Sequence, residues 1–197
     1  MPIELMIAVA TFGFVTSVTP GPNNTYLLAS GANFGTLRSL RFINGIMLGL
    51  GTMLTAAWLG LGAIFAANPM IFQLLKYVGF AYITYIAINV IRSGYKVEAK
   101  QVAEPTFFKA FTLQFVNPKA WIVTTSFVAT YVPVSSGVEV FLIGVALFLI
   151  FTYPGAAIWA AMGQGISSVL NNQKRRRIFN WTAGLLLIAT MVPALFV

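Results

Sequence analysis

The stretch TPGPNN, residues 19–24, lies inside a run of 33 residues without a charge that extends from Leu5 to Leu37. A run of that length can form a helix that crosses a bilayer, which needs about 20 residues. Proline lacks an amide donor and clashes with the preceding helical turn, so two prolines around a glycine predict a break in this helix. In lipid, the carbonyl groups released by the break need partners in the protein or in a water-filled cavity.

A second break is predicted at QFVNPK, residues 114–119, in an apolar run from Ala110 to Val138 whose one charge is Lys119. Both breaks contain asparagine, and each lies well inside its apolar run. Discontinuous membrane helices at corresponding positions of two halves indicate the binding site of a secondary transporter. The alternative is a pair of kinks that only shape the packing of the helices.

The composition around these runs is that of a membrane protein. Of 197 residues, 58% are hydrophobic and 8% are charged, whereas about a quarter are charged in soluble domains. The chain has no Cys, His or Asp, and its four acidic residues are Glu4, Glu98, Glu104 and Glu139. Because the usual nucleophiles, general bases and metal ligands are missing, we expect no catalytic residue, no metal, no cofactor and no enzyme activity.

The charged residues divide the chain into six apolar segments long enough to cross a bilayer. We therefore expect an all-α integral membrane protein, a single domain over residues 1–197. The expected spans are roughly 5–31, 42–66, 70–91, 109–132, 140–164 and 178–197.

The positions of the basic residues predict the orientation. Ten of the 12 lie in loops that six spans place on one face: Arg38 and Arg41; Arg92, Lys96, Lys100 and Lys109; Lys174, Arg175, Arg176 and Arg177. Basic loops face the cytoplasm, so both termini are expected on the periplasmic side. The cluster at 174–177 is interpreted as a contact with anionic lipid headgroups and not as a nucleic-acid site.

A polar segment over residues 92–109 divides the chain into halves of three spans each, about 1–95 and 106–197. We interpret this segment as a cytoplasmic linker. Since three is odd, a duplicated half would insert upside down relative to the first half. The prediction is two inverted three-helix repeats in which the first helix of each repeat is broken.

Lys119 is the single ionisable side chain placed deep in an expected span. It can bind a substrate carboxylate together with the N-terminal end of the resumed helix; snorkelling to the interface and carrying a coupling proton are the alternatives. The side chains and free carbonyls of the first break can accept hydrogen bonds from a substrate ammonium. The candidate substrate-binding residues are Thr19, Pro20, Gly21, Pro22, Asn23, Asn24, Gln114, Asn117, Pro118 and Lys119.

TPGPNN at 19–24, FTLQFVNPKAW at 111–121 and LKYVGFAYITYIAINVIRSG at 75–94 together resemble the LysE/RhtB family of amino-acid exporters. The resemblance covers essentially the whole chain and is closest to the cysteine and O-acetylserine exporters. It implies a secondary transporter of the bacterial inner membrane that exports small amino acids in exchange for protons.

The resemblance and the charges together favour a neutral substrate. Family members that move lysine or arginine tend to carry acidic residues in their spans, and this chain has none there. Cysteine, O-acetylserine, homoserine, threonine and leucine all remain candidates, and no residue is assigned to carry the proton. A carrier of another small solute or lipid, and a membrane scaffold without transport, are the alternatives. The glycine-rich helix faces suit internal packing and a homo-oligomer alike.

Overall fold

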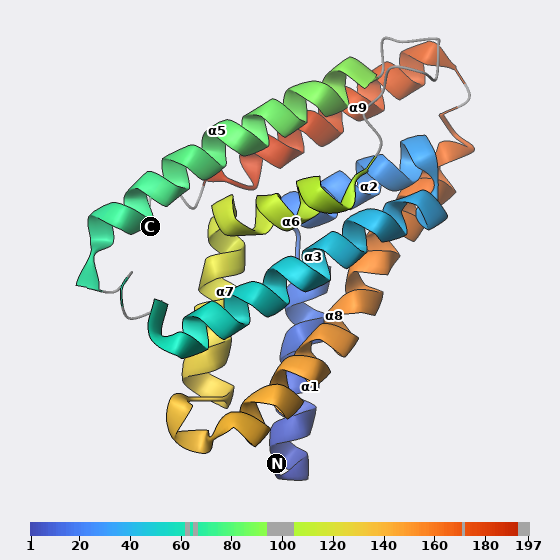
Figure 1. Ribbon diagram of the computed structural model, residues 1–197. Helices are drawn as coiled ribbons and strands as arrows, with labels where there is room; N and C mark the ends of the chain where they lie inside the picture. Colours follow the sequence, from blue (N-terminus) through green and yellow to red (C-terminus); the bar gives the residue numbers. More distant parts are fainter. Residues whose placement is uncertain (62–63, 65–66, 94–104, 171, 193–197) are drawn as a thin grey trace.

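The computed structural model describes residues 1–61, 64, 67–93, 105–170 and 172–192, and all regular structure within these ranges is helical (Figure 1). The predicted linker at 92–109 lies largely outside the described residues, as does the end of the last expected span. The helices are α1 (Ile3–Val18), α2 (Pro22–Phe34), α3 (Thr36–Ala56), α5 (Pro69–Ser93), α6 (Phe107–Val116), α7 (Pro118–Tyr131), α8 (Val138–Ser167) and α9 (Gln173–Ala189). A short helical turn at Ala57–Leu61 follows α3, and another at Val134–Ser136 precedes α8.

Three helical stretches among the described residues are long and apolar enough to cross a membrane: Thr36–Leu61, Gln73–Arg92 and Val138–Ser167. A fourth span results if α1 and α2, which are bent by 61° at their junction, are counted as one. These four match the expected spans at 42–66, 70–91, 140–164 and 5–31. The other two expected spans correspond to α6 with α7 and to α9, which are shorter helices, so the count of six stays a prediction.

Both helix breaks occur where the prolines predict them. The helix of the first break ends at Val18 and resumes at Pro22, and that of the second ends at Val116 and resumes at Pro118. Proline suits the first position of a helix because the missing N–H would have no helical partner there. Asn117 caps α7, since its Oδ1 accepts a hydrogen bond from the backbone N–H of Lys119 at 3.1 Å.

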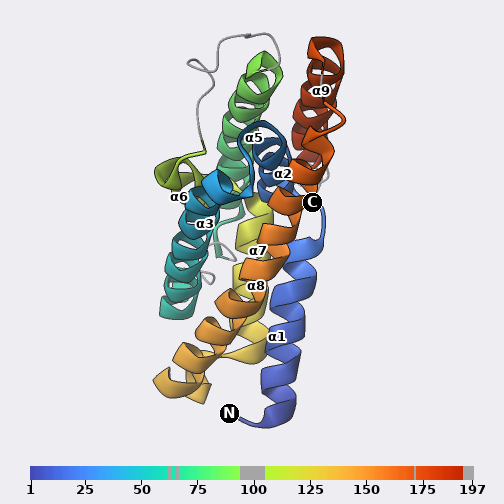
Figure 2. The ribbon, with the colours of Figure 1, turned by 90° about the vertical axis from the view of Figure 1, so that its right-hand side faces the viewer.

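The helices pack in three groups that mix the two halves of the chain. α8 lies along α1 and α2, α3 lies along α6, and α5 lies along α9, as both ribbon views show (Figures 1 and 2). Glycines permit the closest approaches: a Cβ at Gly163 would overlap the carbonyl of Leu28, and one at Gly45 would overlap that of Phe107. These glycines therefore serve helix packing within the chain.

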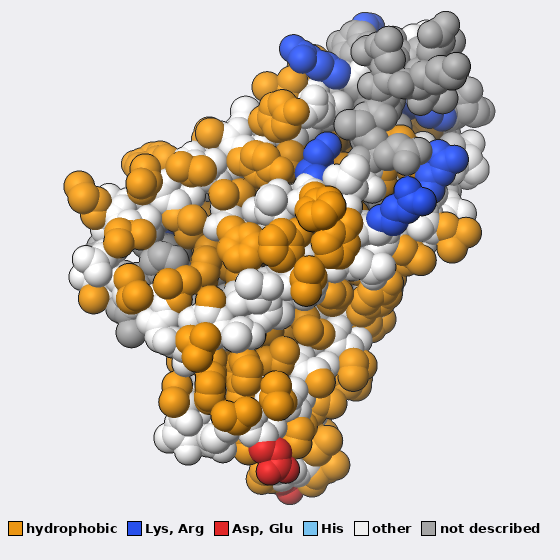
Figure 3. Space-filling model, viewed as in Figure 1, with side chains coloured by type: hydrophobic (Ala, Val, Ile, Leu, Met, Phe, Trp, Pro, Cys, Tyr) orange, Lys and Arg blue, Asp and Glu red, His pale blue; other side chains and the backbone are white. Residues whose placement is uncertain are grey.

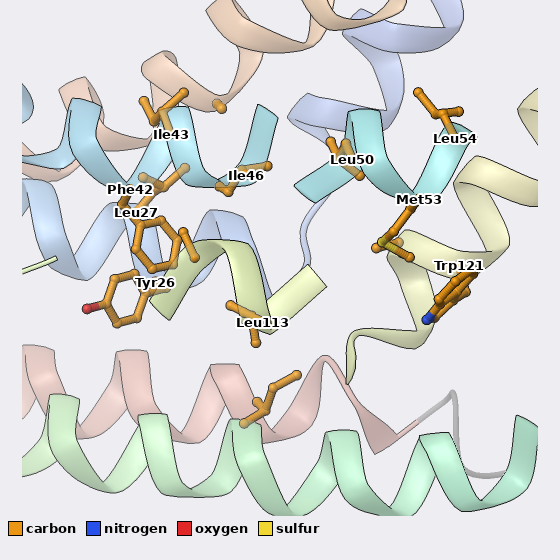
Figure 4. Packing of buried hydrophobic residues seen from close by; sticks show 14 of the residues in the cluster. Tyr26, Leu27, Phe42, Ile43, Ile46, Leu50, Met53, Leu54, Leu113 and Trp121 are labelled. Carbon is orange, nitrogen blue, oxygen red and sulfur yellow. The ribbon is translucent and has the colours of Figure 1, made fainter. Parts of the chain in front are cut away.

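α3 is the central element of the hydrophobic core. Figure 4 shows its buried side chains, including Ile43, Ile46, Leu50 and Met53, packed among the surrounding helices. At the level of α2, the ring of Tyr26 stacks on Phe42 with centroids 4.3 Å apart. This packing holds α3 against both helix breaks and so builds one wall of the site described below.

Charged side chains gather at opposite ends of the molecule (Figure 3). Glu4 and Glu139 lie in the first turns of α1 and α8, at the end that carries the N-terminus. The opposite end carries the basic residues near the start of α3, α6 and α9 and the end of α5: Arg38, Arg41, Arg92, Lys109, Lys174, Arg175, Arg176 and Arg177. The basic loops that are separated along the chain thus lie together at one end of the folded molecule.

Candidate functional site

The two helix breaks meet through the ammonium group of Lys119. Its Nζ donates hydrogen bonds to the Thr19 carbonyl at 2.8 Å, the Thr19 Oγ1 at 2.9 Å and the Pro20 carbonyl at 3.1 Å. An ammonium has three donors, so these three bonds use all of them. Both carbonyls belong to the first break, where the regular helical bonds of α1 have ended.

Asn24 on α2 also donates hydrogen bonds to carbonyls at the first break. Its Nδ2 donates to the Ser17 carbonyl at 2.6 Å and to the Thr19 carbonyl at 2.7 Å, and the side chain is buried. A buried carbonyl without a partner would be costly, especially in lipid. The carbonyls released by TPGPNN are therefore satisfied by one side chain on α2 and one on α7.

A second connection joins α2 to α6. Asn23 Nδ2 donates to Gln114 Oε1 at 2.9 Å, and Gln114 Nε2 donates back to Asn23 Oδ1 at 3.2 Å. Gln114 is fully buried and also donates to the carbonyl of Ala110 at 2.8 Å. This reciprocal amide pair links positions 91 residues apart in the chain.

A cavity of about 60 Å³ lies between the two breaks. This volume exceeds the roughly 10–15 Å³ that a cavity needs to hold one water, so the cavity can admit water or part of a small molecule. One side of the cavity is polar and carries the break residues, and the other is mainly apolar. The lining residues are Thr16, Ser17, Gly21, Pro22, Asn23, Asn24, Ile46, Leu50, Asn117, Lys119, Ala120, Val123, Phe148, Thr152 and Ala156.

The structure brings all ten residues predicted for the site to this one place. Six line the cavity: Gly21, Pro22, Asn23, Asn24, Asn117 and Lys119. The other four support them: Thr19 and Pro20 accept hydrogen bonds from Lys119, Gln114 pairs with Asn23, and Pro118 begins α7. Whether any of them contacts a substrate stays a prediction.

The sequence alone did not identify the rest of the lining. Thr152 on α8 donates to the Gly13 carbonyl at 3.3 Å, and Phe148 packs its ring against Phe127 with centroids 4.9 Å apart. A hydroxyl inside an apolar span is a signal for Thr152, but no pattern distinguishes Phe148 from the other 16 phenylalanines. Lys76, a charged residue of α5, is also buried, with 7% of its surface exposed.

The site offers opposite partial charges side by side. Lys119 and the N-terminal end of α7 supply positive charge, while the carbonyls at the end of α1 supply negative charge. Within the described part of the chain, the lining contains no acidic side chain, and no three potential metal ligands lie together. Such an arrangement can bind a small molecule that carries both an anionic and a cationic group.

Comparisons with known proteins show a family for the chain. The family model described as LysE type translocator matches residues 14–194. A cysteine/O-acetylserine efflux protein of Escherichia coli O139:H28 (strain E24377A / ETEC) is 31% identical over 191 residues, which cover 95% of this chain and 96% of that protein. Proteins with the same description from Escherichia coli (strain K12) and Shigella sonnei (strain Ss046) are each 32% identical, over 83% of this chain and 84% of theirs. No solved structure matches.

Proposed function

Because the chain belongs to the LysE type translocator family, we propose that it exports a small neutral amino acid, of the cysteine and O-acetylserine kind, across the bacterial inner membrane. The observation that carries this proposal is the cavity between the two helix breaks, which Lys119 lines while its ammonium group binds the carbonyls of the first break. This is the arrangement expected at the centre of a secondary transporter with broken helices.

The pose of the substrate follows from the charges around the cavity. The carboxylate binds Lys119 and the first turn of α7, while the ammonium binds the carbonyls of Thr19 and Pro20. The side chain lies against the apolar wall formed by Leu50 and Phe148 with their neighbours. A cationic side chain is disfavoured because the described lining holds no acidic group to pair with it.

The helix contacts support an inverted repeat of six spans. The broken helix of the first half, α1 with α2, packs on α8, which is the second span of the other half. The broken helix of the second half packs in the same way on α3, through α6, and the two third helices, α5 and α9, pack on each other. Exchanging the halves leaves this pattern unchanged, as a two-fold axis in the membrane plane requires.

We also propose that the basic end of the molecule faces the cytoplasm, which places both termini in the periplasm, and that proton entry drives export. The test of coupling is efflux from vesicles with and without an imposed pH gradient. Collapse of the gradient by a protonophore is expected to slow the release of substrate, whereas unchanged efflux would remove proton antiport.

The site is tested by filling the cavity. Val123 lines it, and the adjacent Ile122 on α7 is 47% exposed, which makes the pair a matched comparison. Val123→Trp is expected to abolish efflux of labelled L-cysteine and O-acetyl-L-serine from preloaded vesicles, and Ile122→Trp to preserve it. Labelled L-threonine and L-lysine define the selectivity.

Three outcomes would contradict parts of this proposal. Efflux that survives Val123→Trp in a correctly inserted protein places the substrate path elsewhere. Efflux of L-lysine as fast as that of L-cysteine removes the preference for neutral substrates. No efflux of any amino acid by the unaltered chain favours a carrier of another solute or lipid, or a scaffold.

A further inference from the structure

The cavity separates two groups of helices that each combine both halves of the chain. The first bundle consists of α1, α2 and α8, and the second bundle consists of α3, α6 and α7. The lining from Thr16 to Asn24 and from Phe148 to Ala156 belongs to the first bundle. The remaining lining residues, on α3 and at the second helix break from Asn117 to Val123, belong to the second bundle.

Each bundle contains close contacts at glycines that leave no space for a side chain. In the first bundle, a Cβ at Gly31 would overlap the Ala160 carbonyl, and one at Gly155 would overlap the Ser17 side chain. In the second bundle, a Cβ at Gly49 would lie 2.5 Å from the Gln114 side chain. Packing at this density resists deformation, so we treat each bundle as one unit.

The polar connections across the cavity run between the bundles. The strongest is Lys119, whose three bonds join α7 to the end of α1 over a separation of up to 100 residues. The other connections are between neutral groups: the Asn23–Gln114 amide pair, the Tyr153 hydroxyl that donates to Asn44 Oδ1 at 3.2 Å, the Ser30–Ser39 hydroxyl pair at 2.7 Å, and the Thr36 N–H that donates to Gln164 Oε1 at 2.7 Å. Lys119 alone among these contributes a full charge.

From this geometry we propose that Lys119 is a substrate-binding residue that makes the intact amino-acid zwitterion obligatory for transport, an inference that rests on the proposed function. All three ammonium donors are in use, so a substrate carboxylate binds Lys119 by displacing the acceptors on Thr19 and Pro20. A charged acceptor forms roughly twice as strong a hydrogen bond as a neutral carbonyl, which favours the replacement. The replacement removes the charged connection between the two bundles and permits them to separate.

The same exchange explains the need for the substrate ammonium. When Lys119 leaves, the Thr19 carbonyl keeps its bond from Asn24, but the Pro20 carbonyl and the Thr19 hydroxyl lose their cationic donor. An unpaired carbonyl is costly in a membrane. The α-ammonium of the substrate replaces the lysine ammonium there, so one molecule must supply both charges.

The first test compares three labelled thiols in vesicles that contain the unaltered protein: L-cysteine, cysteamine, which lacks the carboxylate, and 3-mercaptopropionate, which lacks the ammonium. L-cysteine is expected to leave the vesicles at least about ten times faster than either analogue, after subtraction of leakage from protein-free vesicles. Protein-dependent efflux of cysteamine at the rate of L-cysteine would overturn the inference and leave the proposed function standing. If L-cysteine and every other amino acid fail to leave, the proposed function fails.

The second test measures bundle movement, and the absence of native cysteine permits site-specific labelling. Cysteines are introduced at exposed positions and carry spin labels bound by thioether linkages. Labels at Ile158 and Leu48 report the distance between the bundles. Labels at Val15 and Ile158 report a distance within the first bundle. L-cysteine is expected to shift the Ile158–Leu48 distance distribution and to leave the Val15–Ile158 distribution unchanged. A shift within the first bundle, or none between the bundles during active efflux, would overturn the inference.

Variants of Lys119 separate its charge from its bulk. Lys119→Met is expected to abolish the L-cysteine-induced shift and to reduce efflux at saturating substrate, whereas Lys119→Arg restores part of both. An unchanged Val15–Ile158 distance shows that the variant is folded. If Lys119→Met misfolds, the comparison of the three thiols on the unaltered protein decides the inference.

Discussion

Asn24 shows how one side chain makes a helix break tolerable in a membrane. It donates to the carbonyls of Ser17 and Thr19, which the interrupted helix no longer satisfies. Any substitution that removes the amide leaves at least the Ser17 carbonyl to find another partner. The local sequence thus contains both the breaking residues, Pro20 and Pro22, and the residue that compensates for them.

We expect Asn24→Ala to lower the free energy of unfolding by about 1–3 kcal/mol, the usual cost of leaving a buried polar group unsatisfied. The measurement is thermal unfolding of the purified protein in detergent. Asn68→Ala is the control, since that exposed amide donates to the Ile64 carbonyl at 3.1 Å, and its change should stay within about 0.5 kcal/mol. Equal stability of the two variants would contradict the role of Asn24.

Gly21 sets the position of Lys119. A Cβ at this residue would lie 3.0 Å from Lys119 Cδ and 3.1 Å from its Nζ, so the lysine side chain would have to shift. Because that side chain is flexible, Gly21→Ala is expected to reduce efflux of L-cysteine several-fold with little change in the unfolding temperature. Gly51→Ala, where the nearest atom is at an ordinary 3.6 Å, should preserve both. Normal transport by Gly21→Ala would show that the position of Lys119 is not critical.

At the scale of elements, the pairing of α2 with α8 depends on small residues on both helices. Gly163 approaches the Leu28 carbonyl, while Gly165, two residues later on the same helix, has no atom within 4 Å of its potential Cβ. The two glycines therefore differ in environment although both lie in the last turns of α8.

We expect Gly163→Ala to destabilise the fold by about 1–3 kcal/mol, the usual cost of overpacking, because α2 and α8 must separate. Gly165→Ala should be neutral or stabilising by up to about 1 kcal/mol, since alanine is the better helix former. Thermal unfolding of both variants under the same conditions measures the difference. A similar loss of stability in both variants would indicate that the contact of α2 with α8 at Gly163 does not determine the stability of the fold.

At the scale of the whole molecule, the separation of charge predicts the orientation. The acidic residues Glu4 and Glu139 mark one end, and eight described basic residues mark the other (Figure 3). Lys and Arg near the ends of membrane helices are retained on the cytoplasmic side.

A reporter fused to the C-terminus tests the orientation directly. Alkaline phosphatase at this position is expected to be active because that enzyme requires the periplasm, while green fluorescent protein fused there should remain dark. The opposite pattern would remove the model in which both termini are periplasmic. Fusions within the polar segment at 92–109 should give the reverse result and serve as the control.

The sequence by itself determined the properties that arise from local chemistry. Pro20, Gly21 and Pro22 stop the first helix, and Asn117 with Pro118 interrupts the second, so both breaks were predictable from the local sequence. The low charge content indicated a membrane protein. The ten candidate site residues also followed, because they lie within a few positions of the breaks.

Only the tertiary structure decided which groups meet. The partners of Lys119 and Gln114 lie 91 to 100 residues away, and the helical period does not specify which faces of distant helices come into contact. The same is true of Phe148 and Thr152, which line the cavity because α8 packs on the other half of the chain. Sequence reasoning divided the chain into two halves of three spans each. In the fold, close packing at glycines instead joins each half to the other, since helix association depends on complementary surfaces and not on order along the chain.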